Sequence, residues 1–480
     1  MAQTFFFYDL ETSGLNSREA RIMQFAGQRT DMNLKAVGEP YNLLVALNDD
    51  TLPSPEALMI TGITPQQTVA DGYTEAQFAD ILVNEVFTDD TIAVGFNNIR
   101  FDDEFIRTLL WRTFRDPYEW AWRDGRSRWD LLDVVRMTRA LRPEGIVWPE
   151  VDGKPTNRLE LLTKENGIDH TRAHDALSDV EALISITRLI KETQPQLYEY
   201  LLGMRDKRAV QKMINLDDKK PFVYTSGRYE AMYHKTTVAF PLTSGKNGNV
   251  LVYDLRHDPS AFLELSRDEL AAKLFASWQE RQASDFVRLP VKELQYNRAP
   301  AIAPLGVLEQ AEGWQRLGLD TATIAKHQAL LVAAPHFAEN VRSAFESRPA
   351  FPASSDPEAQ LYDGFVSDLD KIRVETVRNA SERELADFHP EFSDERLSPL
   401  LLHYKARNYP KALSEDEQQV WEQWRTARIT TQLPGFMKSL ERIAGEATDT
   451  DTQFIVQELQ LWLESIAPSD VSGDEAELRP

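Results

Sequence analysis

Apolar and polar residues follow two alternating patterns in the first part of the chain. Between Thr4 and about Thr193, strand-like apolar runs such as "TFFFYDLE" and "TIAVGF" alternate with helix-like segments. The helix-like segments include "DEFIRTLLWRTF" and "HDALSDVEALISITRLIKET", in which apolar residues recur with a helical period. The alternation predicts an α/β domain with a covered sheet over residues 1–193.

The pattern changes twice further along the chain. Residues 194–349 hold short β-like runs, "KPFVYTSG", "TTVAFPLT" and "NVLVYDLR", separated by Gly, Pro and Asn, which predicts a small barrel with inserted helices. A Pro- and Ser-rich connector, "SRPAFPASSDPEAQ", then leads to periodic apolar positions, so residues 350–468 are expected to form a helical domain. We expect the tail at 469–480 to be disordered.

Length and composition limit the classes of protein that this chain can belong to. Its 480 residues are enough for about three domains. It has no cysteine, which excludes disulfides, thiolate zinc sites and a cysteine nucleophile. No apolar run approaches the roughly 20 residues of a membrane span, and no signal peptide follows Met1, so we expect a cytoplasmic protein without a membrane partner.

The net charge of −23 argues at first against a nucleic acid partner, because phosphate binding relies on basic surfaces. Much of the acidic excess, however, lies in the C-terminal part of the chain, whereas the segment from Arg107 to Arg142 is rich in arginine. A basic groove is therefore compatible with the overall charge.

The first strand-like run ends in two acids separated by one residue. Alternate residues of a strand share a face, so Phe5, Phe7, Asp9 and Glu11 are expected to line up, and this face turns from apolar to anionic. Neighbouring carboxylates repel each other, and burial leaves them poorly satisfied unless a cation lies between them. An isolated pair of this kind is more often found where a strand ends in solvent. The pair alone therefore does not establish a metal site.

Two further polar clusters accompany this pair. A second strand-like run leads to Asn98, with Asp102 and Asp103 at the start of a helical pattern. Later in the chain, "TRAHDALSDVEAL" brings His174 and Asp179, which regular helix would turn about 500° apart. We therefore expect His174 on the loop before a helix and Asp179 in the first turns of that helix. Each residue has an ordinary explanation as a loop or capping group, but these explanations are much less convincing for all of them together.

The three clusters resemble the motifs of a known family. D-L-E-T from Asp9, N-x-x-F-D from Asn98 and H-x-x-x-x-D from His174 are similar to the motifs of the DEDDh exonucleases, 3′-to-5′ enzymes with a ribonuclease H-like fold and two divalent metal ions. The similarity to the exonuclease I family, bacterial deoxyribonucleases specific for single strands, extends through "SRWDLLDVVR", "LRPEGIVWPE", "RLELLTKENGI", "AQLYDGF" and "YKARNYP". It covers most of the chain. One departure is Leu10, where a close relative has an aromatic residue.

The resemblance implies an α/β fold made of a ribonuclease H-like exonuclease domain, an SH3-like β-barrel domain and a C-terminal helical domain, which together enclose a groove. Phosphodiester hydrolysis needs an activated water, a polarised phosphorus and a stabilised leaving oxygen, which two metal ions roughly 4 Å apart can supply. Mg²⁺ prefers carboxylate oxygens, and we expect Mn²⁺ to substitute for it. The expected metal ligands are Asp9, Glu11, Asp102 and Asp179. The family motif favours Asp102 over Asp103, and His174 is the expected general base.

Candidates for substrate contact are less specific. The resemblance places Thr12 and Asn98 near the terminal nucleotide, and Arg142 is a further candidate. Aromatic side chains that alternate with arginines can stack on unpaired bases and bind phosphates without sequence preference, although tryptophans near a helix are more often core residues. The aromatic residues in this segment are Trp111, Phe114, Tyr118, Trp120, Trp122 and Trp129. The arginines among them are Arg112, Arg115, Arg123, Arg126 and Arg128.

The expected partners follow from the resemblance. They are single-stranded DNA and the acidic, apolar C-terminal tail of single-stranded DNA-binding protein, and the chain is expected to be a monomer. A basic, apolar pocket is needed for that tail, with Lys219, Lys220 or Arg298 as candidates.

Three other functions remain open. An RNA 3′ exonuclease would share all five catalytic residues, a proofreading module would need a polymerase that the chain lacks, and a non-catalytic scaffold would not need the complete set of ligands. A phosphate loop of the form G-x-x-x-x-G-K-[ST] is absent, because asparagine follows the lysine in "SGKNGN". ATP-driven helicase activity is therefore not indicated.

Overall fold

The computed structural model describes residues 2–170, 175–349 and 354–467, and the chain forms two compact units. The first unit is made of three segments, Met1–Ser127, Thr171–Glu181 and Ala353–Pro480. The second unit is made of two segments, Arg128–His170 and Ala182–Pro352. The sequence pattern divides the chain in linear order, whereas the contacts group the C-terminal helices with the N-terminal strands.

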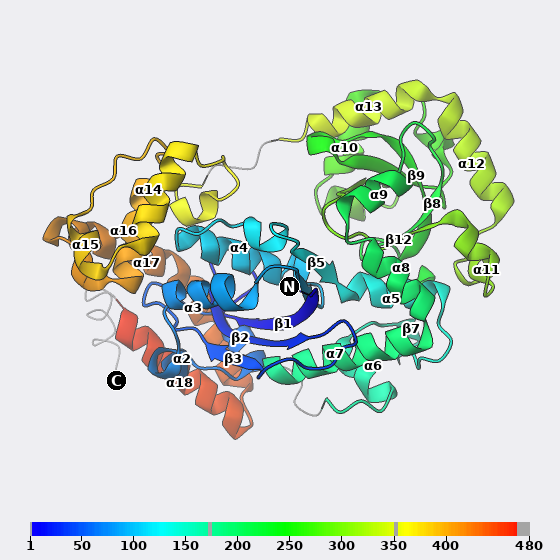
Figure 1. The fold of residues 1–480 in the computed structure, drawn as a ribbon. Helices are drawn as coiled ribbons and strands as arrows, with labels where there is room; N and C mark the ends of the chain where they lie inside the picture. The colour runs from blue at the N-terminus through cyan, green and yellow to red at the C-terminus, as the bar shows by residue number, and fades with distance from the viewer. Residues whose placement is uncertain (1, 171–174, 350–353, 468–480) are drawn as a thin grey trace. The chain divides into compact units, whose positions relative to one another are not determined.

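Strand β1 (Thr4–Thr12) lies inside the sheet of the first unit (Figure 1). It pairs antiparallel with β2 (Ile22–Thr30) and parallel with β4 (Thr91–Gly95). Strand β3 (Tyr41–Leu44) pairs with the other edge of β2, so these four strands lie in the order β3-β2-β1-β4 within a five-stranded sheet. Neighbours on both sides and a covered surface explain why seven of the nine residues of β1 are buried.

The ladder between β1 and β2 is irregular at one end. Glu11 lies opposite Gln24, but Thr12 lies opposite Ile22, so Met23 is an extra residue on β2. A β-bulge of this kind bends the strand and changes the direction of nearby side chains. The irregularity therefore lies beside the second acid of the D-x-E pair.

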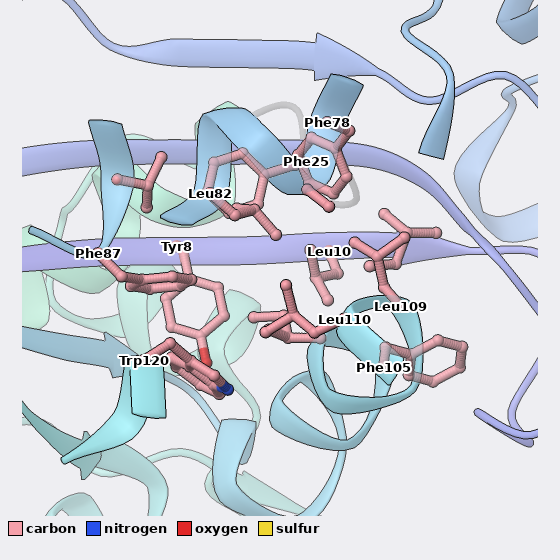
Figure 2. Close-up of a cluster of buried hydrophobic side chains, with 14 of the residues drawn as sticks. Tyr8, Leu10, Phe25, Phe78, Leu82, Phe87, Phe105, Leu109, Leu110 and Trp120 are labelled. Carbon is pink, nitrogen blue, oxygen red and sulfur yellow. The ribbon is translucent and has the colours of Figure 1, made fainter. Parts of the chain in front are cut away.

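One face of β1 packs against helices of the same unit. Figure 2 shows Tyr8 and Leu10 of β1 in one buried cluster with Phe25 of β2 and with side chains of α3 (Glu75–Ile81) and α4 (Asp102–Arg112). Because side chains alternate along a strand, Asp9 and Glu11 point to the opposite face. Two helices lie between β3 and α3 along the chain, α1 (Pro55–Thr61) and α2 (Pro65–Asp71).

The expected C-terminal helices are confirmed. They are α14 (Asp368–Asn379), α15 (Glu382–Asp387), α16 (Leu397–Asn408), α17 (Glu415–Glu446) and α18 (Thr450–Ile466). One core cluster joins Met23 and Leu58 to apolar residues of α17 and α18, and another joins Trp111 and Phe114 to residues of α16. These shared cores explain why both ends of the chain belong to one unit.

The second unit contains the expected barrel-like sheet, in the antiparallel order β11-β10-β9-β8-β12. Its strands are β8 (Phe222–Thr225), β9 (Thr236–Ser244), β10 (Val250–Asp254), β11 (Val291–Leu294) and β12 (Ile302–Pro304). Phe222, Val250, Val252 and Ile302 meet in its core. The three "β-like" runs of the sequence are therefore β8, β9 and β10.

Helices accompany the barrel-like sheet. They are α5 (Leu131–Leu141), α6 (Leu159–Glu165), α8 (Pro195–Gly203), α9 (Lys207–Met213), α10 (Arg267–Phe275), α11 (Gly313–Arg316), α12 (Thr321–Ala333) and α13 (Pro335–Glu346). Short strands β5 (Ser127–Asp130), β6 (Glu150–Val151) and β7 (Lys154–Pro155) precede α8, and α7 (Ala176–Thr193) begins in the first unit and ends in the second. Within the described part of the chain, no helix combines the length and the apolar character that crossing a bilayer requires.

Candidate active site

Four acids from three elements of the first unit come together. Asp9 and Glu11 lie near the end of β1, Asp102 is the first residue of α4, and Asp179 lies in the first turn of α7. Carboxylate oxygens of Asp9, Glu11 and Asp179 all lie within 4.8 Å of one another. Asp102 is close enough for its charge to act on Asp9. The position of Asp179 in the first helical turn was predicted from its spacing and is confirmed.

The electrostatics of this cluster indicate that it can hold a cation. Burial raises the pKa of Asp9 well above its usual range, and the charges of Asp102 and Asp179 raise it further. Burial also raises the pKa of Glu11 to about 9, with added repulsion from Asp9, Asp179 and Asp175. A divalent cation would stabilise the charged forms instead. Because every donor is a carboxylate oxygen, the cluster fits a hard ion such as Mg²⁺.

A second polar cluster is buried on the other face of β1. The Tyr8 hydroxyl donates to Asp103 Oδ1 at 2.5 Å, and Asn98 Nδ2 donates to the Tyr8 oxygen and to Asp103 Oδ1, both at 3.2 Å. Burial and the charges of Asp103 and Asp102 raise the pKa of Tyr8, so Tyr8 remains a donor. This cluster joins β1 to the start of α4.

Tyr8 was not predicted to have a functional role, and Asp103 was considered only as a metal ligand and set aside in favour of Asp102. A signal for them was present, because each is the chain neighbour of an expected metal ligand and each carries a polar group into a run that must be buried. Asp175 was also missed, although it lies between His174 and Asp179 and its charge acts on Glu11.

The expected substrate contacts and the expected general base differ in burial and in hydrogen bonding. Thr12 is 7% exposed, and its hydroxyl donates a hydrogen bond to the backbone carbonyl of Gly14 at 2.9 Å. Asn98 is fully buried, and its amide nitrogen is already used by the Tyr8 cluster. In the second unit, Arg142 donates to Gln310 Oε1 at 2.7 Å. His174 lies outside the described residues, so its role stays a prediction.

Most of the aromatic residues expected near the substrate are core residues. Trp111, Phe114 and Trp120 are at most 5% exposed and belong to clusters of the first unit, while Trp129 of the second unit packs against Tyr198. The stacking interpretation is therefore wrong for these four aromatic residues, because their rings are covered by the protein itself. Trp122 differs, since it is 65% exposed.

The neighbouring arginines also have partners inside the protein. Arg112 contacts Glu75 at 2.6 Å with both side chains buried, and Arg115 contacts Asp80 at 2.5 Å. The other partners are Glu119 for Arg123, Asp89 for Arg126 and the Asn297 carbonyl for Arg128. Three of these five arginines, Arg112, Arg115 and Arg126, are thus paired with acids that lie 35 to 37 positions away in the sequence.

Comparison with known proteins agrees with this architecture. Three family profiles match consecutive segments: Exonuclease at residues 6–187, Exonuclease I SH3-like domain at 205–347 and Exonuclease I C-terminal domain at 355–466. The chain is 39% identical over 464 residues to exodeoxyribonuclease I of Escherichia coli (strain K12), and the match covers 96% of this chain and 97% of that protein. This chain belongs to the exonuclease I family.

Solved exonuclease I structures have the same fold. A crystal structure of E. coli exonuclease I in complex with a dA16 oligonucleotide matches with a TM-score of 0.93 at 38% identity, over 97% of this chain and 100% of that one. A crystal structure of SSB/exonuclease I in complex with the inhibitor CFAM matches with a TM-score of 0.90 at 37% identity, over 97% and 100% of the two chains. The expected order of a ribonuclease H-like exonuclease domain, an SH3-like domain and a helical C-terminal domain is confirmed.

Proposed function

We propose that this member of the exonuclease I family removes 5′-mononucleotides from the 3′ end of single-stranded DNA by metal-dependent hydrolysis. The observation that carries the proposal is the carboxylate cluster of Asp9, Glu11 and Asp179, with Asp102 beside it. A non-catalytic scaffold would have no use for buried carboxylates that raise one another's pKa.

In this proposal, Asp9, Glu11, Asp102 and Asp179 hold two Mg²⁺ ions, which Mn²⁺ can replace. The bound ions would supply Lewis acidity, lower the pKa of the attacking water and stabilise the leaving oxygen. His174 accepts a proton from that water as general base, a task suited to an imidazole near neutral pH. Tyr8, Asn98 and Asp103 keep the strand that carries Asp9 and the helix that carries Asp102 in a fixed arrangement.

The proposed partners are single-stranded DNA and the acidic C-terminal tail of single-stranded DNA-binding protein. Support comes from the relatives solved with an oligonucleotide and as SSB/exonuclease I. Thr12 and Arg142 are proposed substrate contacts, and Lys219, Lys220 and Arg298 are proposed candidates for the tail pocket. The proposed setting is DNA repair and recombination in the cytoplasm, with the chain acting as a monomer.

The test is digestion of end-labelled single-stranded DNA, blunt duplex DNA and single-stranded RNA in Mg²⁺ or in EDTA. The Asp9→Ala variant should lose cleavage, and Asp71→Ala, which changes an exposed acid on α2, should cleave like the wild type. Binding of single-stranded DNA in Ca²⁺ should survive in both variants.

The three substrates separate the alternatives. Mg²⁺-dependent release of mononucleotides from single-stranded DNA alone supports the proposal. Faster digestion of RNA would keep the catalytic cluster but replace the substrate. A wild-type protein that binds single-stranded DNA and cleaves none of the three substrates would be a scaffold, and near-normal cleavage by Asp9→Ala would remove Asp9 from the ligand set.

A further inference from the structure

Two residues, one just before β2 and one near its start, connect the end of β1 to the C-terminal part of the chain. They are Arg21 and Met23, which lie across from the segment that follows Glu11. Met23 is the extra residue of the β-bulge, and its side chain is 1% exposed. It belongs to the core cluster that contains Ile429 and Leu440 of α17. The bulge is therefore packed against a C-terminal helix.

Arg21 is bonded to the end of β1 through its backbone. The Ser13 N–H donates to the Arg21 carbonyl at 2.8 Å, and the Arg21 N–H donates to Ser13 Oγ at 2.8 Å. Ser13 follows Glu11 by two positions, and its pairing with Arg21 continues the register that the bulge has shifted. The backbone of Arg21 thus holds Ser13, two positions after Glu11, at the end of the strand.

The side chain of Arg21 is held by buried carboxylates. Its Nη2 lies 2.8 Å from Glu358 Oε2 and 3.5 Å from Asp50 Oδ2, and its Nε lies 3.9 Å from Glu75 Oε1. The side chains of Arg21, Glu358 and Asp50 are at most 1% exposed. Ion pairs this deeply buried are expensive to break, because removal of one partner leaves an uncompensated charge.

Glu358 is itself fixed by helix α16. Its Oε1 lies 2.5 Å from Arg407 Nη1 and 2.9 Å from His403 Nδ1, and Arg407 also contacts Asp50 at 2.8 Å. Burial acts to raise the pKa of Glu358, but the charges of Arg407 and Arg21 hold it well below its usual range. The carboxylate is therefore ionised and joins the C-terminal region to Arg21.

The same region contains a group of metal-type ligands, Asp356, Glu358 and His403, whose ligand atoms lie within 4.8 Å of one another. Both oxygens of Glu358 already contact guanidinium groups, those of Arg21 and Arg407. Positive charges at these distances oppose a further cation. The group is better explained as part of an ion-pair network.

We propose that Arg21 is a positioning residue for the metal site: Glu358 holds its guanidinium, and its backbone holds the strand end that directs Glu11 toward Asp9 and Asp179. The inference rests on the proposed function, because it treats Glu11 as a metal ligand. The C-terminal helical region thus affects metal binding through the buried Glu358–Arg21 ion pair and the backbone pairing of Arg21 with Ser13.

The test measures Mn²⁺ affinity of the full-length protein from the loss of the free-ion EPR signal, together with urea unfolding. Glu358→Gln removes the charge that holds Arg21, and Ser13→Ala removes the acceptor for the Arg21 N–H while the ion pairs stay intact. Each change should raise the Kd for Mn²⁺ by about 10-fold, the scale of groups that orient metal ligands. Arg21→Lys keeps the positive charge and should raise the Kd for Mn²⁺ less than Glu358→Gln does.

A matched control is Glu417→Gln, the same chemical change in an ion pair of the C-terminal region, where Glu417 contacts buried Lys405 at 2.6 Å. It should leave Mn²⁺ affinity unchanged. In the double variant Ser13→Ala/Glu358→Gln, the increase in Kd should be smaller than the product of the single increases, because both changes act through Arg21.

The outcomes distinguish this inference from the proposed function. If Glu358→Gln lowers stability but binds Mn²⁺ like the wild type and Glu417→Gln, the network is structural and the inference is overturned. If Glu358→Gln does not fold, the Mn²⁺ affinity of Ser13→Ala tests the inference. An unchanged Kd for Mn²⁺ in Ser13→Ala overturns it. If Glu11→Gln itself binds Mn²⁺ normally, Glu11 is not a ligand, and the part of the proposed function on which the inference rests is wrong.

Discussion

The Tyr8 hydroxyl donates a hydrogen bond of 2.5 Å to Asp103, and the two residues are the chain neighbours of Asp9 and Asp102. This bond joins β1 to the first turn of α4 from the face that is turned away from the carboxylate cluster. A hydrogen bond in the low-dielectric interior is stronger than the same bond in water. Tyr8 and Asp103 therefore help to fix the separation of Asp9 from Asp102, although neither needs to contact substrate.

Replacing Tyr8 by Phe should destabilise the protein and slow cleavage. Asp103 is fully buried and would lose a hydrogen bond of 2.5 Å, which costs about 1–3 kcal/mol of unfolding free energy. Urea unfolding and the rate of single-stranded DNA cleavage check this expectation. Tyr41→Phe is the control, because the Tyr41 hydroxyl lies 3.4 Å from Glu85 at an exposed position. Equal effects of the two changes would show that the buried bond has no special role.

Replacing Asp179 by Asn should have opposite effects without and with metal. In EDTA the variant should melt above the wild type, because a charge that repels Asp9 and Glu11 is removed. In Mg²⁺ the wild type should gain stability by binding the ion, and the variant should gain much less. Melting curves at increasing Mg²⁺ concentration measure both effects.

The control for this change is Asp71→Asn on the exposed surface of α2. It should respond to Mg²⁺ as the wild type does. An Asp179→Asn protein with a full Mg²⁺ response would exclude Asp179 from the ligands.

The raised pKa of Glu11 predicts how stability depends on pH in EDTA. The folded carboxyl group holds its proton up to about pH 9, whereas an unfolded Glu releases it near its ordinary pKa of about 4.3. The unfolded state therefore binds fewer protons between these values, and the unfolding free energy should fall as pH rises, by at most about 1.4 kcal/mol per pH unit for one proton. Saturating Mg²⁺ should flatten the slope, because the ion stabilises the charged form in the folded protein.

Urea unfolding at about pH 6 and about pH 8, with EDTA or Mg²⁺, measures this dependence. Glu11→Gln removes the titrating group and should show a shallower slope in EDTA. A metal-free wild-type protein that becomes more stable toward pH 8 would contradict the prediction.

The carboxylate cluster was more predictable from the sequence than its surroundings. The period of a strand places Asp9 and Glu11 on one face, and the period of a helix separates Asp179 from the preceding loop, so these expectations need no knowledge of tertiary contacts. Arg112 looked like a phosphate ligand because its buried partner, Glu75, lies 37 positions away. The link between Arg21 and Glu358 spans 337 positions, and no local pattern reports a contact at that distance.

Two neighbouring tryptophans should respond in opposite ways to removal of the ring. Trp120 is 4% exposed and packs against Phe87 with ring centroids 4.6 Å apart, so Trp120→Ala should cost about 3–5 kcal/mol of unfolding free energy. Trp122 is 65% exposed, and Trp122→Ala should leave stability nearly unchanged. If the exposed ring stacks on an unpaired base, its loss should weaken binding of single-stranded DNA in Ca²⁺ by about 1–3 kcal/mol. Wild-type affinity in Trp122→Ala would exclude stacking by the one large, well-exposed ring of this segment and would leave DNA contacts to other parts of the protein.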